Sequence, residues 1–176
     1  IRQALPGVQL IANDTNQGFS GGSNRGMAWA LAQGDAPILL LNNDAMIGEA
    51  AVLRLIQTVE ENPKIGMVVP QLFDEQGELV AAGGKNPAFH LQTRVKKFPD
   101  ENPVQIVETI SGTAVLIRAA MLQQVGLLDE RFFFSTEMAD LSLRARKYGY
   151  VCAVDRRAQA SHAVSRSAPL RSSLYV

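Results

Sequence analysis

Asp44 stands just past the point where a buried strand is predicted to end. Four apolar residues, Ile38 to Leu41, follow Pro37 and precede Asn42. This pattern is typical of a short strand buried on both faces in the middle of a parallel sheet. Ligands of open α/β sheets bind outside the carboxyl ends of the strands, so a carboxylate here is placed to hold a metal ion or a ligand hydroxyl. Turn formation is the alternative, because Asn and Asp are favoured where a strand stops.

A second polar stretch, residues 16–26, is rich in glycine and precedes a helix predicted from about residue 23 to residue 33. Glycine lets a backbone come very close to a ligand, and the unpaired N–H groups of a helix start can meet an anion. The spacing is neither that of the dinucleotide fingerprint nor that of the P-loop. An ordinary flexible turn is the alternative interpretation.

Acidic residues open the last predicted helix. Ser135 and Thr136 precede Glu137 and Asp140, and Gly149 ends the helix. Compensation of the helix dipole is one explanation for the two carboxylates. A little earlier, Ser111-Gly112 interrupts a strand-like region over residues 106–117, and a missing side chain there lets a ligand or another strand approach.

The remaining pattern predicts the elements that position these residues. Strands and helices alternate in the first part of the chain, at residues 8–12, 23–33, 38–41, 49–61 and 65–69. Such alternation is typical of right-handed crossovers in an α/β fold with a mostly parallel sheet flanked by helices. Residues 71–105 hold turn residues and basic side chains without a period, which predicts an irregular excursion or a flap. We also predict an irregular tail over residues 158–176.

Length and charge limit the classes of function. A chain of 176 residues suits one domain, residues 1–176, with a sizeable core. Lysine plus arginine equals aspartate plus glutamate at 17 each, so no net positive field attracts nucleic acid or an anionic membrane. The single cysteine, Cys152, lies in an apolar run and is predicted to be buried. No apolar segment reaches the roughly 20 residues of a membrane span.

Taken in order, the motifs resemble those of family 2 glycosyltransferases with the GT-A fold, particularly the rhamnosyltransferase-like members that build bacterial cell-surface polysaccharides. The resemblance covers nearly the whole chain. It rests on Asn16-x-Gly18-Phe19-Ser20-Gly21-Gly22-x-Asn24-x-Gly26, Leu40-Leu41-Asn42-Asn43-Asp44, Ser111-Gly112-Thr113-Ala114, Gly126-Leu127-Leu128-Asp129-Glu130-x-Phe132-Phe133, Glu137-x-x-Asp140-Leu141-x-x-Arg144 and His162. The resemblance implies a Rossmann-like GT-A domain.

The same resemblance implies a function and a set of site residues. It implies inverting transfer of a sugar from a UDP- or dTDP-linked donor to a hydroxyl of a polysaccharide or lipid-linked glycan, with Mn²⁺ or Mg²⁺. Asp44 and His162 are the implied metal ligands, although a surface position is the alternative for His162. Gly112 is implied to face the acceptor. Donor binding is assigned to Asn16, Gly18, Gly22, Asn24, Asn42 and Asn43.

Two departures from the family pattern qualify this assignment. The family places an aspartate base after the glutamate that opens the last helix, and this chain has Met138 there. Methionine cannot accept a proton, so Glu137 or Asp140 is the candidate catalytic base. The chain also begins at Ile1, without the family's first strand and its nucleotide-base-binding segment. We therefore expect a natural chain that starts earlier, and an open sheet edge through which this one can self-associate.

These departures leave alternatives to an active glycosyltransferase. A non-catalytic nucleotide- or sugar-binding module fits the replacement of the base by Met138, and an inactive fragment fits the missing first strand. The expected location is cytoplasmic, with a peripheral position at the inner membrane as a variant of it.

Overall fold

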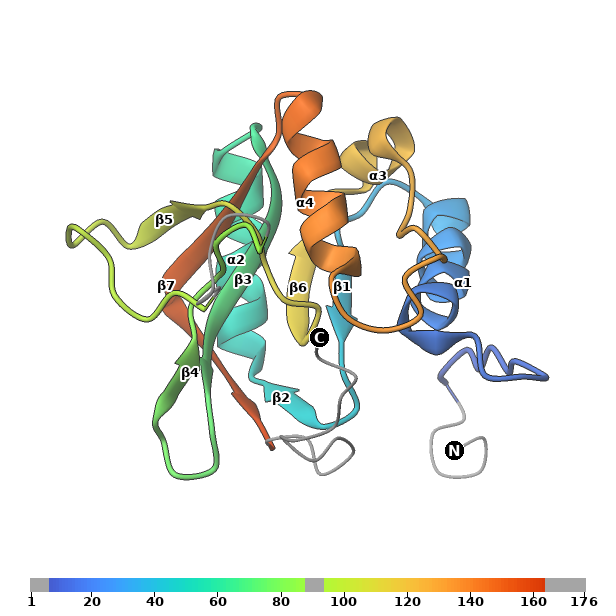
Figure 1. Cartoon of the computed structure of the whole chain (residues 1–176), viewed down its shortest axis with the longest axis horizontal. Helices are drawn as coiled ribbons and strands as arrows, with labels where there is room; N and C mark the ends of the chain where they lie inside the picture. The colour runs from blue at the N-terminus through green and yellow to red at the C-terminus, as the bar shows by residue number, and fades with distance from the viewer. Residues whose placement is uncertain (1–6, 88–93, 164–176) are drawn as a thin grey trace.

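The computed structural model describes residues 7–87 and 94–163, which form a mixed α/β domain (Figure 1). Its helices are α1 (Gly18–Gln33), α2 (Glu49–Glu61), α3 (Ala119–Val125) and α4 (Glu137–Lys147). Its strands are β1 (Ile38–Leu41), β2 (Ala45–Ile47), β3 (Ile65–Phe73), β4 (Leu79–Ala81), β5 (Val104–Val107), β6 (Ala114–Ile117) and β7 (Val151–His162). The predicted boundaries of α2, residues 49–61, agree with these bounds.

The sheet is mixed, which corrects the prediction of a mostly parallel one. Its main order is β1-β6-β3-β7-β2, with β4 on β3 and β5 on β7. Only β3 and β7 pair in parallel, and the other pairs are antiparallel. Strand β6 is antiparallel to both β1 and β3, so β1 and β3 run in the same direction, as their helical connection predicted. The error arose because β6, from later in the chain, inserts between them.

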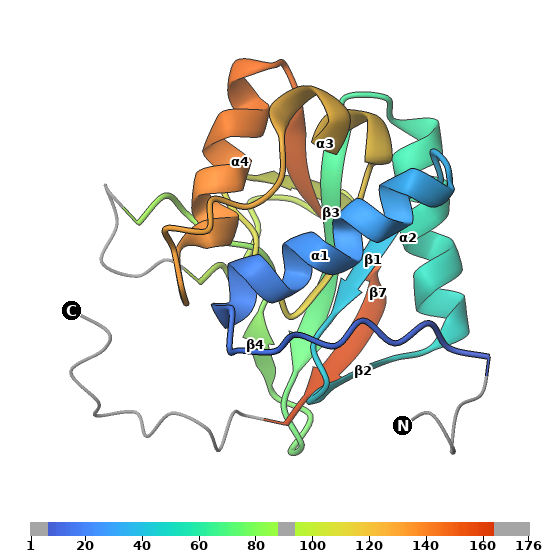
Figure 2. The same cartoon turned by 90° about the vertical axis from the view of Figure 1, so that its right-hand side faces the viewer.

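Helices cover both faces of this sheet, and the core follows the alternation of its strands (Figures 1 and 2). Side chains from α1, α3 and α4 pack with one set of strand residues, and side chains from α2 pack with the other. In β3, Met67 and Val69 join the first cluster while Val68 joins the second. Cys152 belongs to the first cluster, and burial raises the pKa of its thiol to about 11. Its predicted burial is confirmed.

Strand β1 lies at the border of the sheet rather than in its middle. Among the described residues β1 pairs with β6 alone, and its four residues are half-buried except Leu41, which is 41% exposed. The prediction of a strand buried on both faces is therefore wrong for this chain. Residues 8–12, which we expected to form a neighbouring strand, have no strand pairing in the structure.

Regular structure reaches further into the excursion and the tail than their composition indicated. Strand β3 continues through Pro70 to Phe73, with a register shift against β7 between Pro70 and Gln71, a position at which a sheet tolerates proline. Strand β4 then pairs back on β3. Strand β7 runs on to His162, so the first part of the predicted tail is a strand. The rest, residues 164–176, lies outside the described residues, as do 88–93.

No helix in the described ranges is both long enough and apolar enough to cross a bilayer.

Candidate active site

Strand pairing brings together the two predicted metal ligands. Asp44 immediately precedes β2 and His162 ends β7, and the antiparallel register sets Ala45 opposite His162. The backbone N–H of Ala163 donates to the carbonyl of Asp44 at 3.0 Å, which continues this pairing by one residue. As a result, Nε2 of His162 lies 3.2 Å from Oδ1 of Asp44.

The Asp44 carboxylate is not satisfied by this approach. Its Oδ1 atom is buried and has no hydrogen-bond partner among the described residues, because the contact with His162 lacks hydrogen-bond geometry. A buried carboxylate oxygen without a partner is costly unless a ligand completes it. An aspartate oxygen and an imidazole nitrogen are both ligand types that Mn²⁺ accepts. No cluster of three or more His, Cys, Asp or Glu side chains that could hold a metal ion occurs among the residues described.

The predicted donor loop is already helical, which corrects the expected helix start near residue 23. Helix α1 begins at Gly18, whose backbone has φ +67°. The side chain of Asn16 accepts a hydrogen bond from the N–H of Gly18 at 2.9 Å, and the carbonyl of Phe133 accepts one from the N–H of Phe19 at 2.8 Å. Two of the N–H groups expected to meet an anion therefore have partners inside the protein.

Glycine at position 18 is required by this packing. A Cβ atom there would lie 2.3 Å from the carbonyl oxygen of Phe133, and the positive φ already disfavours other residues. Ser20 strengthens the same contact, because its hydroxyl donates to the carbonyl of Phe132 at 2.6 Å. The glycine-rich sequence thus brings α1 against the loop that leads into α4.

Asn24 also holds this loop. It is 7% exposed, and its amide donates to the carbonyl of Leu128 and to the carboxylate of Glu130 while accepting the N–H of Leu128. With these bonds made, its amide is committed to structure. Gly22 has open space around it, because a Cβ added there would lie 4.0 Å from its nearest neighbour, Nδ2 of Asn13.

The two asparagines before Asp44 differ in their surroundings. The N–H of Asn42 donates to the carbonyl of Thr113, and its carbonyl accepts the N–H of Ala45. Asn43 is exposed. Neither side chain forms a hydrogen bond with another described residue, so both stay candidates for donor binding.

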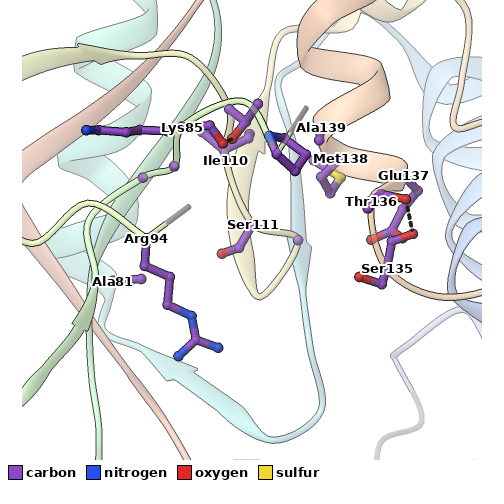
Figure 3. A pocket seen from close by; sticks show the side chains of 15 residues that line it. Ala81, Lys85, Arg94, Ile110, Ser111, Ser135, Thr136, Glu137, Met138 and Ala139 are labelled. Atoms are coloured by element: carbon purple, nitrogen blue, oxygen red, sulfur yellow. Dashed lines mark hydrogen bonds between the residues drawn. The ribbon is translucent and has the colours of Figure 1, made fainter. Parts of the chain in front are cut away.

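A cavity of about 270 Å³ lies at the start of α4 (Figure 3). Glu137 and Met138 of α4 line it together with Gly112 and with Gly83 and Gly84 from the opposite wall. A Cβ on Gly112 would lie 2.6 Å from Cζ of Phe19 and 3.2 Å from Cγ of Met138. The absence of a side chain at position 112 therefore lets Phe19 and Met138 pack closely against the backbone there, and the predicted acceptor-facing role of Gly112 stays a prediction. Asp44 and His162 do not line this cavity.

Glu137 is the acidic group of the cavity. The residue is 8% exposed, and its Oε2 atom is buried without a hydrogen-bond partner among the described residues. Burial raises the pKa of this carboxyl, and a hydrogen bond from its own backbone N–H offsets part of the rise. A carboxylate that is poorly solvated and poorly paired is a stronger base when ionised, which suits proton transfer.

The other two positions of the predicted base are less suited to it. Met138 is 3% exposed and belongs to the main apolar cluster. Asp140 does not line the cavity, and its carboxylate accepts a hydrogen bond from Nε of Arg144 at 2.7 Å. Arg144 also donates to the carbonyls of Val125 and Leu127. The Asp140–Arg144 pair thus fastens α4 to the end of α3.

Several cavity residues were missed from the sequence. Figure 3 shows Ser135, Thr136 and Glu137 on one side of Ser111 and Lys85 and Arg94 on the other. Ser135 and Thr136 have φ of 73° and 68°, a left-handed conformation that is rare for non-glycine residues. Such strain often accompanies functional sites. The signal for Arg94 was its place among the basic side chains of residues 71–105, which we interpreted as an irregular excursion or a flap.

No protein-family profile matches the chain. Among curated proteins, it is 26% identical over 187 aligned positions to the N-acetylglucosaminyl-diphospho-decaprenol L-rhamnosyltransferase of Mycobacterium tuberculosis, covering 91% of this chain and 60% of that protein. It is 24% identical over 145 residues to the low-salt glycan biosynthesis hexosyltransferase Agl10 of Haloferax volcanii, covering 80% of this chain and 47% of the relative. The chain thus spans about half the length of the relatives it matches.

The fold is also that of a solved glycosyltransferase. The structure of GalNAc-T7 with UDP, GalNAc and Mn²⁺ superposes with a TM-score of 0.69 at 15% identity, covering 87% of this chain and 32% of that one. The fold expected from the motifs is confirmed, with the mixed sheet noted above. The chain thus has the GT-A fold, and its sequence is similar to those of hexosyltransferases and rhamnosyltransferases of glycan biosynthesis.

Proposed function

We propose that this domain works in a glycosyltransferase that moves a sugar from a nucleotide diphosphate to an acceptor hydroxyl, with inversion at the sugar. The donor is UDP- or dTDP-linked, and the acceptor is a polysaccharide or a lipid-linked glycan. The carrying observation is the pair of Asp44 and His162, which strand pairing sets 3.2 Å apart with a buried Asp44 oxygen left unsatisfied. The rhamnosyltransferase and hexosyltransferase relatives support this reaction class.

Asp44 and His162 would hold the divalent metal. Bound there, Mn²⁺ or Mg²⁺ would supply positive charge against the departing diphosphate. The GalNAc-T7 structure contains Mn²⁺ with UDP, which supports a metal in a domain of this fold. Asn42 and Asn43 adjoin Asp44 and are the predicted donor contacts whose side chains have no other partner in the described residues.

Glu137 is the proton acceptor in this proposal. The acceptor oxygen forms a bond to the anomeric carbon, the bond from that carbon to the diphosphate breaks, and the hydroxyl proton passes to Glu137. Glu137 must be ionised to do so, and burial raises its pKa. The rate should therefore rise with pH as Glu137 loses its proton.

The experiment that tests the proposal is a nucleotide-release assay with a panel of UDP- and dTDP-sugars in Mn²⁺. Release of nucleotide that depends on Mn²⁺ and is lost in Asp44→Asn would support it. The domain is a binding module if both the wild type and Met138→Asp bind the nucleotide-sugar in a metal-dependent way and neither releases free nucleotide from it. That second function is favoured by Met138 alone, since methionine cannot serve as a base.

Self-association is a separate proposal carried over from the sequence. Among the described residues β1 has one paired side and a half-exposed surface, and open strand edges promote pairing between chains. Sedimentation at increasing concentration tests it. A chain that stays monomeric throughout would exclude pairing through β1. The cytoplasmic location also stays a prediction.

A further inference from the structure

The loop between α3 and α4, residues 126–136, leads directly into Glu137, the first residue of α4. No side chain among the described residues caps this helix start, so its first turn lacks the usual means of being fixed. The last two loop residues, Ser135 and Thr136, are both left-handed. That conformation persists in non-glycine residues only where surrounding contacts impose it. The position of Glu137 therefore depends on what holds this loop.

Two side chains of α1 hold the loop, which passes the first turns of α1 (Figure 2). The amide of Asn24 donates to the carbonyl of Leu128 at 2.9 Å and accepts the N–H of the same residue at 3.0 Å. The hydroxyl of Ser20 donates to the carbonyl of Phe132 at 2.6 Å. The carbonyl of the following residue accepts the backbone N–H of Phe19. The loop is thus fastened to α1 near its beginning and again three residues before its left-handed end.

Both side chains are turned into this contact and away from solvent. Ser20 has no exposed surface, and Asn24 is 7% exposed. A ligand reaches neither side chain unless α1 and the loop part. Removal of either side chain leaves a loop carbonyl without its donor, and the loop must shift to find another partner. The shift is transmitted to the start of α4, because only Phe133 to Thr136 lie between the Ser20 contact and Glu137.

We propose that Ser20 and Asn24 are positioning residues for Glu137. They hold the loop so that its left-handed end fixes the first turn of α4, and with it the Glu137 carboxylate, in the lining of the cavity. The inference rests on the proposed function, in which Glu137 accepts the proton, and adds to it the residues that act through Glu137. It gives Asn24 a role different from the donor contact that the motif implied.

The carboxyl group of Glu137 reports its own position. Its pKa is raised by burial and not by a neighbouring charge. Lys85 and Arg94 are the other charged residues that line the cavity in the described part of the chain, and Asp140, one turn along α4, pairs with Arg144. When the loop moves, water reaches the carboxylate, and the pKa falls toward its ordinary value of 4.5.

The first test is an NMR titration of the carboxyl carbons of the chain without metal or nucleotide, which requires no turnover. The signal of Glu137 is assigned by its absence in Glu137→Gln. We expect its pKa to lie above 4.5 in the wild type, lower in Ser20→Ala and lowest in Asn24→Ala. Thr58→Val is the matched control and should leave this pKa unchanged, because it removes a similarly buried hydroxyl that binds Asp155 under α2.

The second test measures nucleotide release and metal-dependent UDP binding in the same variants. Release should fall about tenfold in Ser20→Ala and about 10²-fold in Asn24→Ala, while the UDP midpoint in Mn²⁺ should stay within about twofold of that of the wild type. This combination separates a positioning role from a donor contact, which would weaken UDP binding.

An unchanged Glu137 pKa in both variants would overturn the proposal, and so would an equal fall of that pKa in Thr58→Val. Weaker UDP binding with an unchanged pKa would also overturn it and assign Asn24 to the donor. If Asn24→Ala does not fold, Ser20→Ala decides by itself. A wild-type chain that releases no nucleotide would contradict the proposed function, whereas the NMR titration still decides whether Ser20 and Asn24 position Glu137.

Discussion

The two ends of the site differ in how closely their residues match the family pattern. At the Asp44 end, the residues match the family pattern, and strand pairing between β2 and β7 brings the two predicted ligands together. At the α4 end, the family's base is replaced by Met138, yet the residue before it, Glu137, has a buried oxygen without a partner among the described residues. Each end thus has one unsatisfied carboxylate oxygen. A motif thus predicts well which two side chains lie together when backbone pairing fixes them, and it leaves the base open when one substitution replaces it.

The largest effect should come from Glu137→Gln. The variant keeps the shape of the side chain but cannot accept a proton, so nucleotide release should fall by about 10²- to 10⁴-fold. Metal-dependent nucleotide binding should be unchanged, which separates the two ends of the site. Glu75→Gln, an exposed glutamate in the β3–β4 turn, is the matched control. If Glu137→Gln releases nucleotide as fast as the wild type does, Glu137 is not the catalytic base.

Asp44→Asn should act at the other end only. Loss of one anionic oxygen should weaken Mn²⁺ binding in the presence of UDP by about 100-fold, the upper part of the range for groups that orient or bind a metal. His162→Ala should weaken it by about tenfold. Asp35→Asn, whose carboxylate accepts a hydrogen bond from Gln123, should have no effect. Equal loss in Asp35→Asn would mean a general electrostatic effect and no local metal site.

Alanine substitutions at two glycines of α1 should distinguish a role in packing from a role in donor binding. Gly18→Ala places a Cβ against the Phe133 carbonyl at a positive φ, and should reduce the unfolding free energy by about 2–3 kcal/mol. Gly22→Ala has room and lies inside a helix, so it should raise that free energy by about 0.5–1 kcal/mol. Urea denaturation measures both. If the stabilised Gly22→Ala chain also loses nucleotide binding, the predicted donor contact at Gly22 is supported.

The smallest effect concerns stability against pH. Burial raises the pKa of Glu137 above its ordinary value of 4.5, so the folded chain holds a proton that the unfolded chain releases. The stability from this group is present below pH 4.5 and is lost as pH rises through the raised value. Glu137→Gln should match wild type near pH 4 and exceed it by about 1 kcal/mol at pH 7.5. A constant difference between the two chains across this range would contradict an unsatisfied carboxylate.

Local signals predicted much of this molecule. The apolar period of α2 gave its bounds, since Leu55 and Val59 face the sheet. The pairing of β6 between β1 and β3 could not be predicted, because it depends on contacts between residues 48 to 79 positions apart. The start of α1 was missed partly for the same reason: the N–H of Gly18 is satisfied locally by Asn16, but the N–H of Phe19 donates to the distant carbonyl of Phe133.

The site was predictable to a similar degree. Asp44, His162, Glu137 and Gly112 follow from motif order, and the structure assigns each of them to one of the two ends. Asn24 was assigned to the donor, but its buried amide holds the loop at Leu128. Asp140 was a candidate base, but it pairs with Arg144. In both cases the sequence predicted a polar side chain that binds a partner. It could not predict which partner, because that depends on tertiary contacts that a motif does not contain.

Calorimetric titration of the chain with UDP and with dTDP, each with and without Mn²⁺, tests the central claim most directly. We expect binding of at least one nucleotide that requires Mn²⁺ and is lost in Asp44→Asn. Circular dichroism of the same samples verifies that both chains are folded. A folded wild-type chain that binds neither nucleotide in Mn²⁺, or that binds equally well with Asn at position 44, would contradict a metal-dependent donor site at Asp44 and His162.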